Sequence, residues 1–136
     1  MNQRVFVDTS GYFAFAYDRD QHFSEARLTM QQLAASGADL YTTNFVAAEL
    51  HALLVNRVNR EIARQFLDRL YAGTTHIIRV TEPDEQRARD LLHQHSDKDY
   101  SLVDALSFVV MQRLHIRSAW AYDHHFSQFG FSLAVQ

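Results

Sequence analysis

The order of hydrophobic and polar positions predicts strands that alternate with helices along the chain. Arg4–Val7 is a short run of β-branched and aromatic residues that ends in a polar turn, which is typical of a buried strand. Further strands are expected over residues 39–42, 75–80, 116–122 and 131–135. Apolar residues at helical spacing predict helices over residues 21–36 and from 44 through 54. A further helix should follow the polar stretch 56–60 and end near Gly73, and two more are expected from 81 to about 95 and over 101–114.

Strands that alternate with helices pair in parallel through crossover connections, which place helices on both faces of one sheet. The sequence therefore predicts a three-layer α/β/α sandwich with a Rossmann-like parallel sheet of four to five strands. The chain has one proline and four glycines and no linker, so one domain over residues 1–136 is expected. In open sheets of this kind, functional sites form beyond the carboxyl ends of the strands.

Composition narrows the class of protein. Hydrophobic residues make up 47% and charged residues 21% of the 136 residues, which is typical of a folded globular domain. The absence of cysteine excludes disulfides and thiolate chemistry, so a metal site would use oxygen or imidazole ligands. Neither a signal peptide nor a run of about 18 apolar residues is present, and a cytoplasmic protein with no membrane partner is expected.

The net charge of −3 argues weakly against a nucleic-acid partner. Twelve of the thirteen basic residues are arginine, however, and arginine is better suited than lysine to bidentate contact with phosphate. Cations bound by acidic residues would also make the working protein less negative. Charge therefore decides little.

Four carboxylates stand out because apolar residues surround them in the sequence. Asp8 and Asp123 each end an apolar run that predicts a strand, whereas Glu49 and Asp104 lie among apolar residues of predicted helices. Each one alone has a structural explanation as a helix cap or as the partner of an arginine. Four together are harder to explain, because a carboxylate on an apolar face is costly unless it is paired or bound to a cation.

A hard divalent cation would resolve the repulsion between converging carboxylates, and Mg²⁺ or Mn²⁺ prefers oxygen ligands. Such a site suits phosphodiester hydrolysis, because the metal activates water, positions the phosphate and stabilises charge on the leaving oxygen. The candidate catalytic and metal-binding residues are therefore Asp8, Glu49, Asp104 and Asp123.

Four segments resemble the PIN domain in their order and spacing along essentially the whole chain. They are Val7-Asp8-Thr9-Ser10, the Ala-Ala-Glu-Leu helix around Glu49, Ser101–Phe108, and Tyr122–Phe126 before Gly130-Phe131. The sequence is similar above all to the toxin nucleases of VapBC toxin–antitoxin pairs and to their solitary relatives. The resemblance implies a Mg²⁺- or Mn²⁺-dependent endoribonuclease that acts on RNA, with the four acids at its metal site.

The same resemblance implies a homodimer and a small antitoxin protein that occludes the site. Thr9 or Ser10 would supply a hydroxyl near the metal or its water, and Asp99 would either assist or be a solvated loop acid. Ala121 departs from the family pattern, in which the residue two before the last acid is often threonine or serine. This departure leaves open whether one ion or two ions bind.

The histidines invite a zinc hypothesis that the sequence does not favour. His93 with His95, and His124 with His125, have suggestive spacing, but structural zinc prefers four dedicated ligands and cysteine is missing. His124 or His125 would contact substrate phosphate or, by the favoured interpretation, lie at the surface.

Two further features have both a functional and a structural interpretation. Arg57, Arg60 and Arg64 recur at helical spacing and would contact an RNA backbone or, by the favoured interpretation, form a solvated helix face. The aromatic segment 12–17 would stack on bases or, by the favoured interpretation, belong to the core or to a protein interface.

Two other functions fit parts of the pattern. Asp8 would serve as the nucleophile of a phosphotransferase, but this interpretation leaves Glu49 unexplained and offers only Lys98 as the required lysine. A PIN-like fold without catalysis would be an RNA-binding or assembly module. The presence of all four acids argues against the second alternative.

Overall fold

Five parallel strands form one sheet in the computed structural model, which describes residues 2–134. The strands are β1 (Arg4–Val7), β2 (Asp39–Thr43), β3 (His76–Ile78), β4 (Ser118–Trp120) and β5 (Ser132–Leu133). Their order is β3-β2-β1-β4-β5, and each neighbouring pair is parallel. The strand order reverses between β1 and β4, which is where open sheets of this kind bind ligands.

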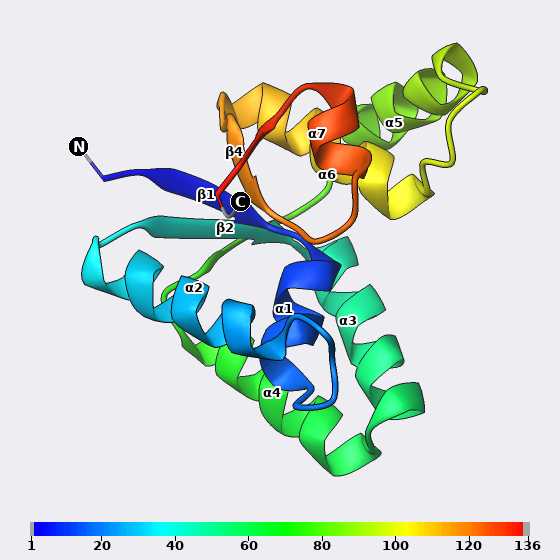
Figure 1. Ribbon diagram of the computed structural model, residues 1–136. Helices are drawn as coiled ribbons and strands as arrows, with labels where there is room; N and C mark the ends of the chain where they lie inside the picture. The colour runs from blue at the N-terminus through cyan, green and yellow to red at the C-terminus, as the bar shows by residue number, and fades with distance from the viewer. Residues whose placement is uncertain (1, 135–136) are drawn as a thin grey trace.

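Helices cover both faces of this sheet and produce the predicted three-layer sandwich. They are α1 (Thr9–Ala16), α2 (Phe23–Ala35), α3 (Asn44–Arg57), α4 (Arg60–Ala72), α5 (Glu82–Gln94), α6 (Leu102–Leu114) and α7 (His125–Phe129). Figure 1 shows α1 to α4 on one face of the sheet and α5 to α7 on the other. The predicted α/β architecture is therefore confirmed.

The core is built around β1, the central strand. Val5, Phe6 and Val7 are fully buried because helices cover both faces of the sheet, which explains why this strand is a continuous apolar run. On one side of β1, α6 buries every residue from Asp104 to Met111. No helix within residues 2–134 has the length and apolar character needed to cross a membrane.

Helix α1 begins directly after β1, where the sequence pattern indicated only a polar turn. The Asp8 side chain caps the helix by accepting a hydrogen bond from the Ser10 backbone amide. The segment lacks a polar face that would reveal helical periodicity, because most of its side chains are apolar. Gly11 permits a close approach to β4, since a Cβ there would lie 2.8 Å from the Trp120 carbonyl oxygen. As a result, the start of α1 lies against the end of β4.

Two expected strands are shorter than the sequence pattern indicated. The segment 75–80 contains only β3, and 116–122 contains only β4. β3 is an edge strand and therefore has a pairing partner on one side only. The fifth strand, expected over 131–135, is present as β5, while Val135 lies outside the described residues.

Candidate active site

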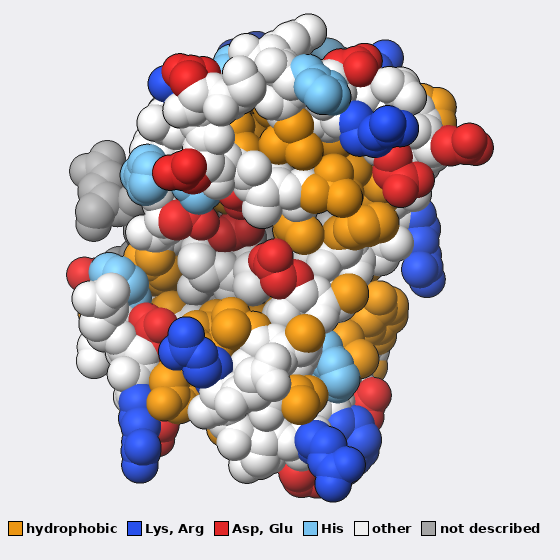
Figure 2. All heavy atoms as spheres, turned by 90° about the vertical axis from the view of Figure 1, so that its right-hand side faces the viewer, with side chains coloured by type: hydrophobic (Ala, Val, Ile, Leu, Met, Phe, Trp, Pro, Cys, Tyr) orange, Lys and Arg blue, Asp and Glu red, His pale blue; other side chains and the backbone are white. Residues whose placement is uncertain are grey.

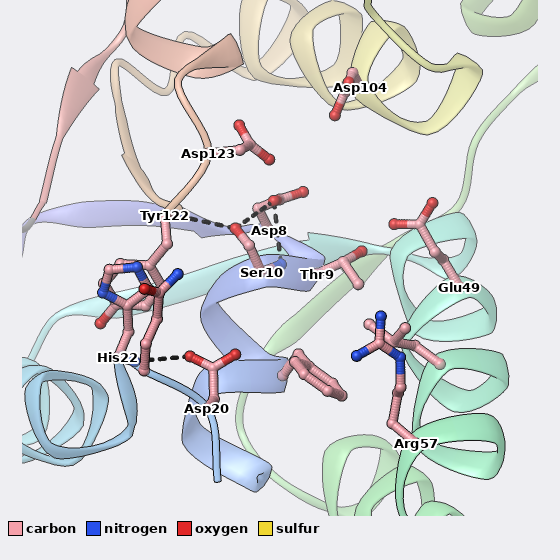
Figure 3. A pocket seen from close by; sticks show the side chains of 13 residues that line it. Asp8, Thr9, Ser10, Asp20, His22, Glu49, Arg57, Asp104, Tyr122 and Asp123 are labelled. Atoms are coloured by element: carbon pink, nitrogen blue, oxygen red, sulfur yellow. Dashed lines mark hydrogen bonds between the residues drawn. The ribbon is translucent and has the colours of Figure 1, made fainter.

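A cavity of about 450 Å³ opens at the carboxyl ends of β1 and β4. Its charged lining residues are Asp8, Asp20, Glu49, Asp104, Asp123 and Arg57, and His22 also lines it. Seen from the carboxyl edge of the sheet, acidic side chains gather in a hollow between the two helix layers (Figure 2). All four acids singled out in the sequence therefore line one cavity (Figure 3).

Asp8 is held between β1 and β4 by a chain of hydrogen bonds. Its Oδ2 accepts bonds from the Ser10 hydroxyl at 2.7 Å and from the Ser10 amide at 3.2 Å. The Ser10 hydroxyl in turn accepts a bond from the Tyr122 amide at 2.9 Å. The Asp8 amide donates to the Trp120 carbonyl oxygen at 3.0 Å. These bonds fix the Asp8 carboxylate at the point where the strand order reverses.

Burial and neighbouring negative charge make Asp8 hard to ionise. Only 3% of its surface is exposed, and no basic residue within residues 2–134 forms an ion pair with it. Burial is the largest cause that raises the pKa of Asp8 to about 7, and the charge of Asp123 adds to it. The Ser10 hydrogen bonds oppose this rise, while Asp104 makes a smaller contribution in the same direction as Asp123. A bound cation would favour the ionised carboxylate and so lower the pKa of Asp8.

Asp104 combines a structural contact with a position in the cavity. It forms a capping box at the start of α6, in which its Oδ2 accepts the Ser101 amide at 3.0 Å and its own amide donates to the Ser101 hydroxyl. The helix cap that the sequence offered as an alternative explanation is therefore present. It coexists with a place in the cavity wall, so the cap alone does not account for the residue.

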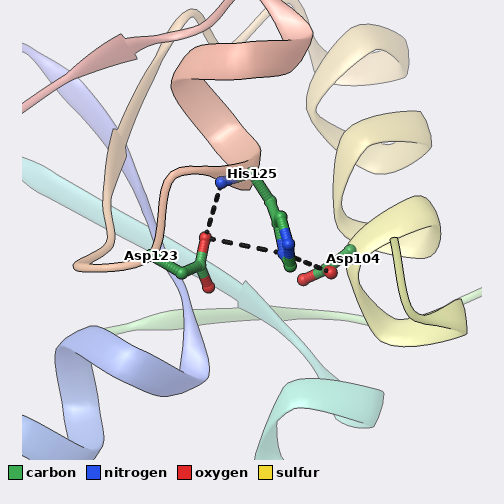
Figure 4. A group of neighbouring side chains, drawn as sticks. All are labelled: Asp104, Asp123 and His125. Carbon is green, nitrogen blue, oxygen red and sulfur yellow. Dashed lines mark hydrogen bonds and ion pairs between the residues drawn. The ribbon is translucent and has the colours of Figure 1, made fainter. Parts of the chain in front are cut away.

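His125 joins Asp104 to Asp123. Its Nδ1 lies 2.9 Å from Asp104 Oδ2 and 3.9 Å from Asp123 Oδ1, and its backbone amide donates to Asp123 Oδ1 at 3.0 Å (Figure 4). This Nδ1 is buried and makes no aligned hydrogen bond. One ligand atom from each of these three residues lies within 4.8 Å of the others, which is the spacing of a candidate metal site.

The three aspartates share one arrangement that fits a metal site. In Asp8, Asp104 and Asp123, one carboxylate oxygen accepts hydrogen bonds from the chain, and the other accepts none from residues 2–134. The Thr9 hydroxyl is also buried at the cavity without a hydrogen-bond partner. A buried hydroxyl without a partner is costly, and carboxylate oxygens are the ligands that hard cations prefer. These residues therefore fit a hard divalent cation such as Mg²⁺ or Mn²⁺.

Glu49 lines the same cavity but differs from the aspartates in its surroundings. It lies in the second turn of α3 and is exposed to solvent. It is not a member of the cluster whose ligand atoms lie within 4.8 Å of one another. In Figure 3 its carboxylate approaches from the side of the cavity opposite Asp123.

The auxiliary residues expected from the sequence occupy different environments. Ser10 bonds to the Asp8 carboxylate and Thr9 lines the cavity, so both hydroxyls lie at the site. Asp99 is exposed in the loop before α6 and does not line the cavity. Ala121 is buried, and its side chain offers no hydroxyl there.

The arginine series separates into two groups. Arg60 and Arg64 are exposed on α4, and Arg64 forms ion pairs with Glu61 and Asp68, as expected of a solvated helix face. Arg57, the last residue of α3, instead lines the cavity and points toward it (Figure 3). It makes no ion pair among residues 2–134, so its guanidinium is available to an anionic ligand.

The sequence pattern missed the position of His125, which the favoured interpretation put at the surface. His124 is exposed as expected, but the His125 side chain is only 18% exposed and contacts Asp104. The available signal was its position two residues after a strand-terminal acid, at the start of a short helix. The aromatic segment is mostly core, as favoured, since Tyr12 and Phe13 are buried.

The chain matches the PIN domain family over residues 5–132. It therefore belongs to the PIN domain family, as the four motifs in the sequence indicated.

Within this family, the chain resembles VapC proteins. It is 32% identical over 127 residues to the 23S rRNA-specific endonuclease VapC20 of Mycobacterium tuberculosis, and the match covers 93% of this chain and 95% of VapC20. The crystal structure of VapC20, described as a sarcin-ricin loop cleaving toxin, matches with a TM-score of 0.87 at 30% identity and the same coverage. FitAcB from Neisseria gonorrhoeae matches with a TM-score of 0.66 at 16% identity over 95% of both chains, which shows the fold alone.

Proposed function

We propose that this protein is a metal-dependent endoribonuclease, the toxin of a VapBC-type pair. The observation that carries the proposal is the set of three aspartates that each leave one carboxylate oxygen without a hydrogen bond, at one cavity, among residues 2–134. The names of the VapC20 relative, an endonuclease and a toxin, support the same function. The residues 1–136 would form one nuclease domain.

The proposed metal ligands and catalytic residues are Asp8, Glu49, Asp104 and Asp123. Mg²⁺ or Mn²⁺ held by these acids would lower the pKa of a bound water and neutralise charge that develops on the phosphate. His125 is a fifth candidate, because its Nδ1 belongs to the close cluster with Asp104 and Asp123. An imidazole ligand would favour Mn²⁺ over Mg²⁺, since Mg²⁺ strongly prefers oxygen.

The other side chains would orient these acids and the substrate. Ser10 holds the Asp8 carboxylate through two hydrogen bonds, so the second oxygen of Asp8 has a fixed direction. Thr9 offers a buried hydroxyl for a water or a phosphate oxygen. Arg57 would contact a phosphate of the RNA backbone, because it is the arginine at the cavity and has no ion-pair partner in the described chain.

The proposed substrate is structured ribosomal RNA. The VapC20 relative is named for cleavage of 23S rRNA, and its crystal structure is described as that of a sarcin-ricin loop cleaving toxin. The similarity covers nearly the whole of both chains. A ribosomal substrate agrees with the cytoplasmic location that the sequence predicts.

We also propose a homodimer and a small antitoxin protein as partners. The resemblance to VapC toxins supports both partners. An antitoxin also agrees with the proposed activity, because a toxin nuclease must be restrained in the cell that makes it. The antitoxin surface that covers the cavity would carry positive charge and few hydrogen-bond acceptors, because the cavity presents several carboxylates without a cation partner.

Cleavage of a labelled RNA that contains the sarcin-ricin loop tests the function. The purified protein is incubated with Mg²⁺, Mn²⁺ or EDTA, beside Asp8→Asn and the matched control Asp68→Asn, an exposed acid on α4. We expect cleavage that requires the metal, falls on the order of a thousandfold in Asp8→Asn and is unchanged in Asp68→Asn.

Two results would contradict the proposal. Cleavage that survives EDTA and Asp8→Asn would exclude the carboxylate site as its source. Metal binding without cleavage of any RNA would favour the alternative, a catalytically silent RNA-binding or assembly module.

A further inference from the structure

A stacked pair of aromatic rings stands beside the acidic residues. The rings of His22 and Tyr122 are almost parallel, with an interplanar angle of 5° and centroids 4.3 Å apart. Both residues line the cavity, and Tyr122 directly precedes Asp123. Figure 3 shows the pair at one side of the aspartates and Arg57 at the other.

Tyr122 is fixed relative to the candidate catalytic acids. Its amide donates to the Ser10 hydroxyl, which also bonds to Asp8, and its own hydroxyl accepts a bond from Trp120 Nε1 at 3.1 Å. Trp120 is fully buried, so this contact anchors the tyrosine ring to the core. Any group that stacks on the pair is therefore held at a defined position beside Asp8 and Asp123.

His22 leaves part of this stack open to a ligand. Its backbone amide donates to Asp20 Oδ1 at 2.8 Å, which fixes the residue just before α2. One face of its ring lies against Tyr122, and 32% of its side-chain surface remains exposed. Its side chain makes no capping bond to α2, and its one charged neighbour there is the exposed Glu25, whose Oε2 lies 3.5 Å from His22 Nδ1.

We propose that His22 and Tyr122 form the base-binding subsite of the enzyme, in which a nucleobase next to the scissile phosphate stacks on the His22 ring. This inference rests on the proposed function, because it assigns a role to residues of the same cavity. Flat aromatic rings are the groups on which single-stranded RNA bases stack, whatever the base. With Arg57 on the opposite side to contact phosphate, the two features define a path for the strand across the aspartates.

The chain offers a matched control for this pair. The ring of His76, on β3, stacks on Tyr41, on β2, with centroids 4.5 Å apart and an interplanar angle of 25°. His76 is exposed, and neither residue lines the cavity. Replacement of His76 by alanine removes the same kind of stack without touching the proposed subsite.

The test measures binding of short labelled RNA strands to proteins that carry Asp8→Asn, so that the strands stay intact. The strands share one sequence and contain a single abasic nucleotide at each position in turn. We expect His22→Ala to weaken binding of the complete strand about tenfold, and His76→Ala to leave it unchanged. One abasic position should weaken binding by a similar factor with His22 present, and should have little further effect once His22 is replaced by alanine.

Tyr122→Phe keeps the ring that packs on His22 and removes the hydroxyl that anchors it to Trp120, so it separates the stacking surface from its anchor. Binding of RNA should fall by less in this variant than in His22→Ala, and the dependence on the abasic position should remain. The proposal would be overturned if His22→Ala and His76→Ala weakened RNA binding equally. It would also be overturned if the loss of affinity caused by His22→Ala simply added to the loss caused by the abasic nucleotide at every position.

Failure of the subsite and failure of the nuclease give different results. RNA that binds with this pattern but is never cut by the wild-type protein would contradict the proposed function alone. Metal-dependent cleavage by the wild-type protein without any dependence on His22 would contradict the subsite alone.

Discussion

Two buried aspartates in this protein have opposite environments. Asp84 and Asp8 are 1% and 3% exposed, respectively. Both oxygens of Asp84 are occupied: Oδ1 accepts Arg113 Nε at 2.9 Å, and Oδ2 accepts an Arg113 terminal nitrogen at 2.8 Å and the Thr81 amide at 3.0 Å. Asp8 has one occupied oxygen and no cation partner within residues 2–134.

The pKa values of the two aspartates differ accordingly. Burial acts to raise the pKa of Asp84, but the hydrogen bonds from Arg113 and Thr81 and the arginine charge together lower it. Burial and nearby acids raise the pKa of Asp8 to about 7. A fully paired buried acid has a structural role, whereas a buried acid with an unused oxygen marks a place where the fold accommodates a ligand. At nearly equal exposure, the comparison therefore separates an acid that is paired with a cation from one that is not.

Removal of the arginine from the paired site has the largest expected effect on stability. Arg113→Met leaves Asp84 buried without its cation, so the free energy of unfolding should fall by about 3 to 5 kcal/mol. Urea denaturation measures this loss. The double variant Asp84→Asn/Arg113→Met keeps the capping bond to Thr81 and should recover most of the stability. An Arg113→Met protein as stable as the wild type would remove the distinction between the two sites.

In metal-free protein, removal of the charge of the unpaired acid Asp8 should raise the free energy of unfolding, whereas Arg113→Met lowers it. The folded-state pKa of Asp8, about 7, lies above its ordinary value of 3.8, so the folded state binds this proton more tightly. The contribution of Asp8 therefore lowers stability as pH rises from about 4 to 7, and it is constant outside that window.

Asp8→Asn removes this titration and should stabilise the metal-free protein above pH 7 by about 2 to 4 kcal/mol. Urea denaturation in EDTA at several pH values measures the difference. The amide oxygen that replaces the carboxylate can still accept the Ser10 bonds, so the variant isolates the charge. A variant that is less stable than the wild type at every pH would show that Asp8 is a structural acid like Asp84.

The smallest effect on stability is expected at Glu49, which lines the cavity but is exposed. Glu49→Gln should change the free energy of unfolding by less than about 0.5 kcal/mol. The rate of RNA cleavage should nevertheless fall by about 10- to 100-fold, because the substitution removes a metal ligand or a residue that orients one. Asp99→Asn serves as the comparison, and cleavage there should be unchanged because Asp99 lies outside the cavity. Equal activity of the two variants would remove Glu49 from the site.

The sequence predicts the layers and most of the acidic site because both depend on local patterns. Asp8 and Asp123 follow apolar runs that end at the same edge of a parallel sheet, so their proximity follows from topology. Helix α1 is missed because its apolar residues face both the sheet and neighbouring helices, which leaves no polar stripe to reveal the period.

The remaining features depend on contacts that no local pattern encodes. His125 and His124 are neighbours in sequence, and only the turn into α7 decides that the first contacts Asp104 while the second is exposed. His22 lies in the connection between α1 and α2, and its stack on Tyr122 joins segments a hundred residues apart. The unused oxygens of the aspartates likewise become visible only when every hydrogen bond is placed.

Calorimetric titration with Mn²⁺ tests the central claim most directly, namely that the unpaired aspartates form a cation site. Wild-type protein, Asp8→Asn, Asp123→Asn and Asp84→Asn/Arg113→Met are titrated under the same conditions. Saturable binding to the wild type and to the double variant, with strong loss in Asp8→Asn and Asp123→Asn, is the predicted result. Binding of equal affinity in all four proteins, or in none, would contradict the account.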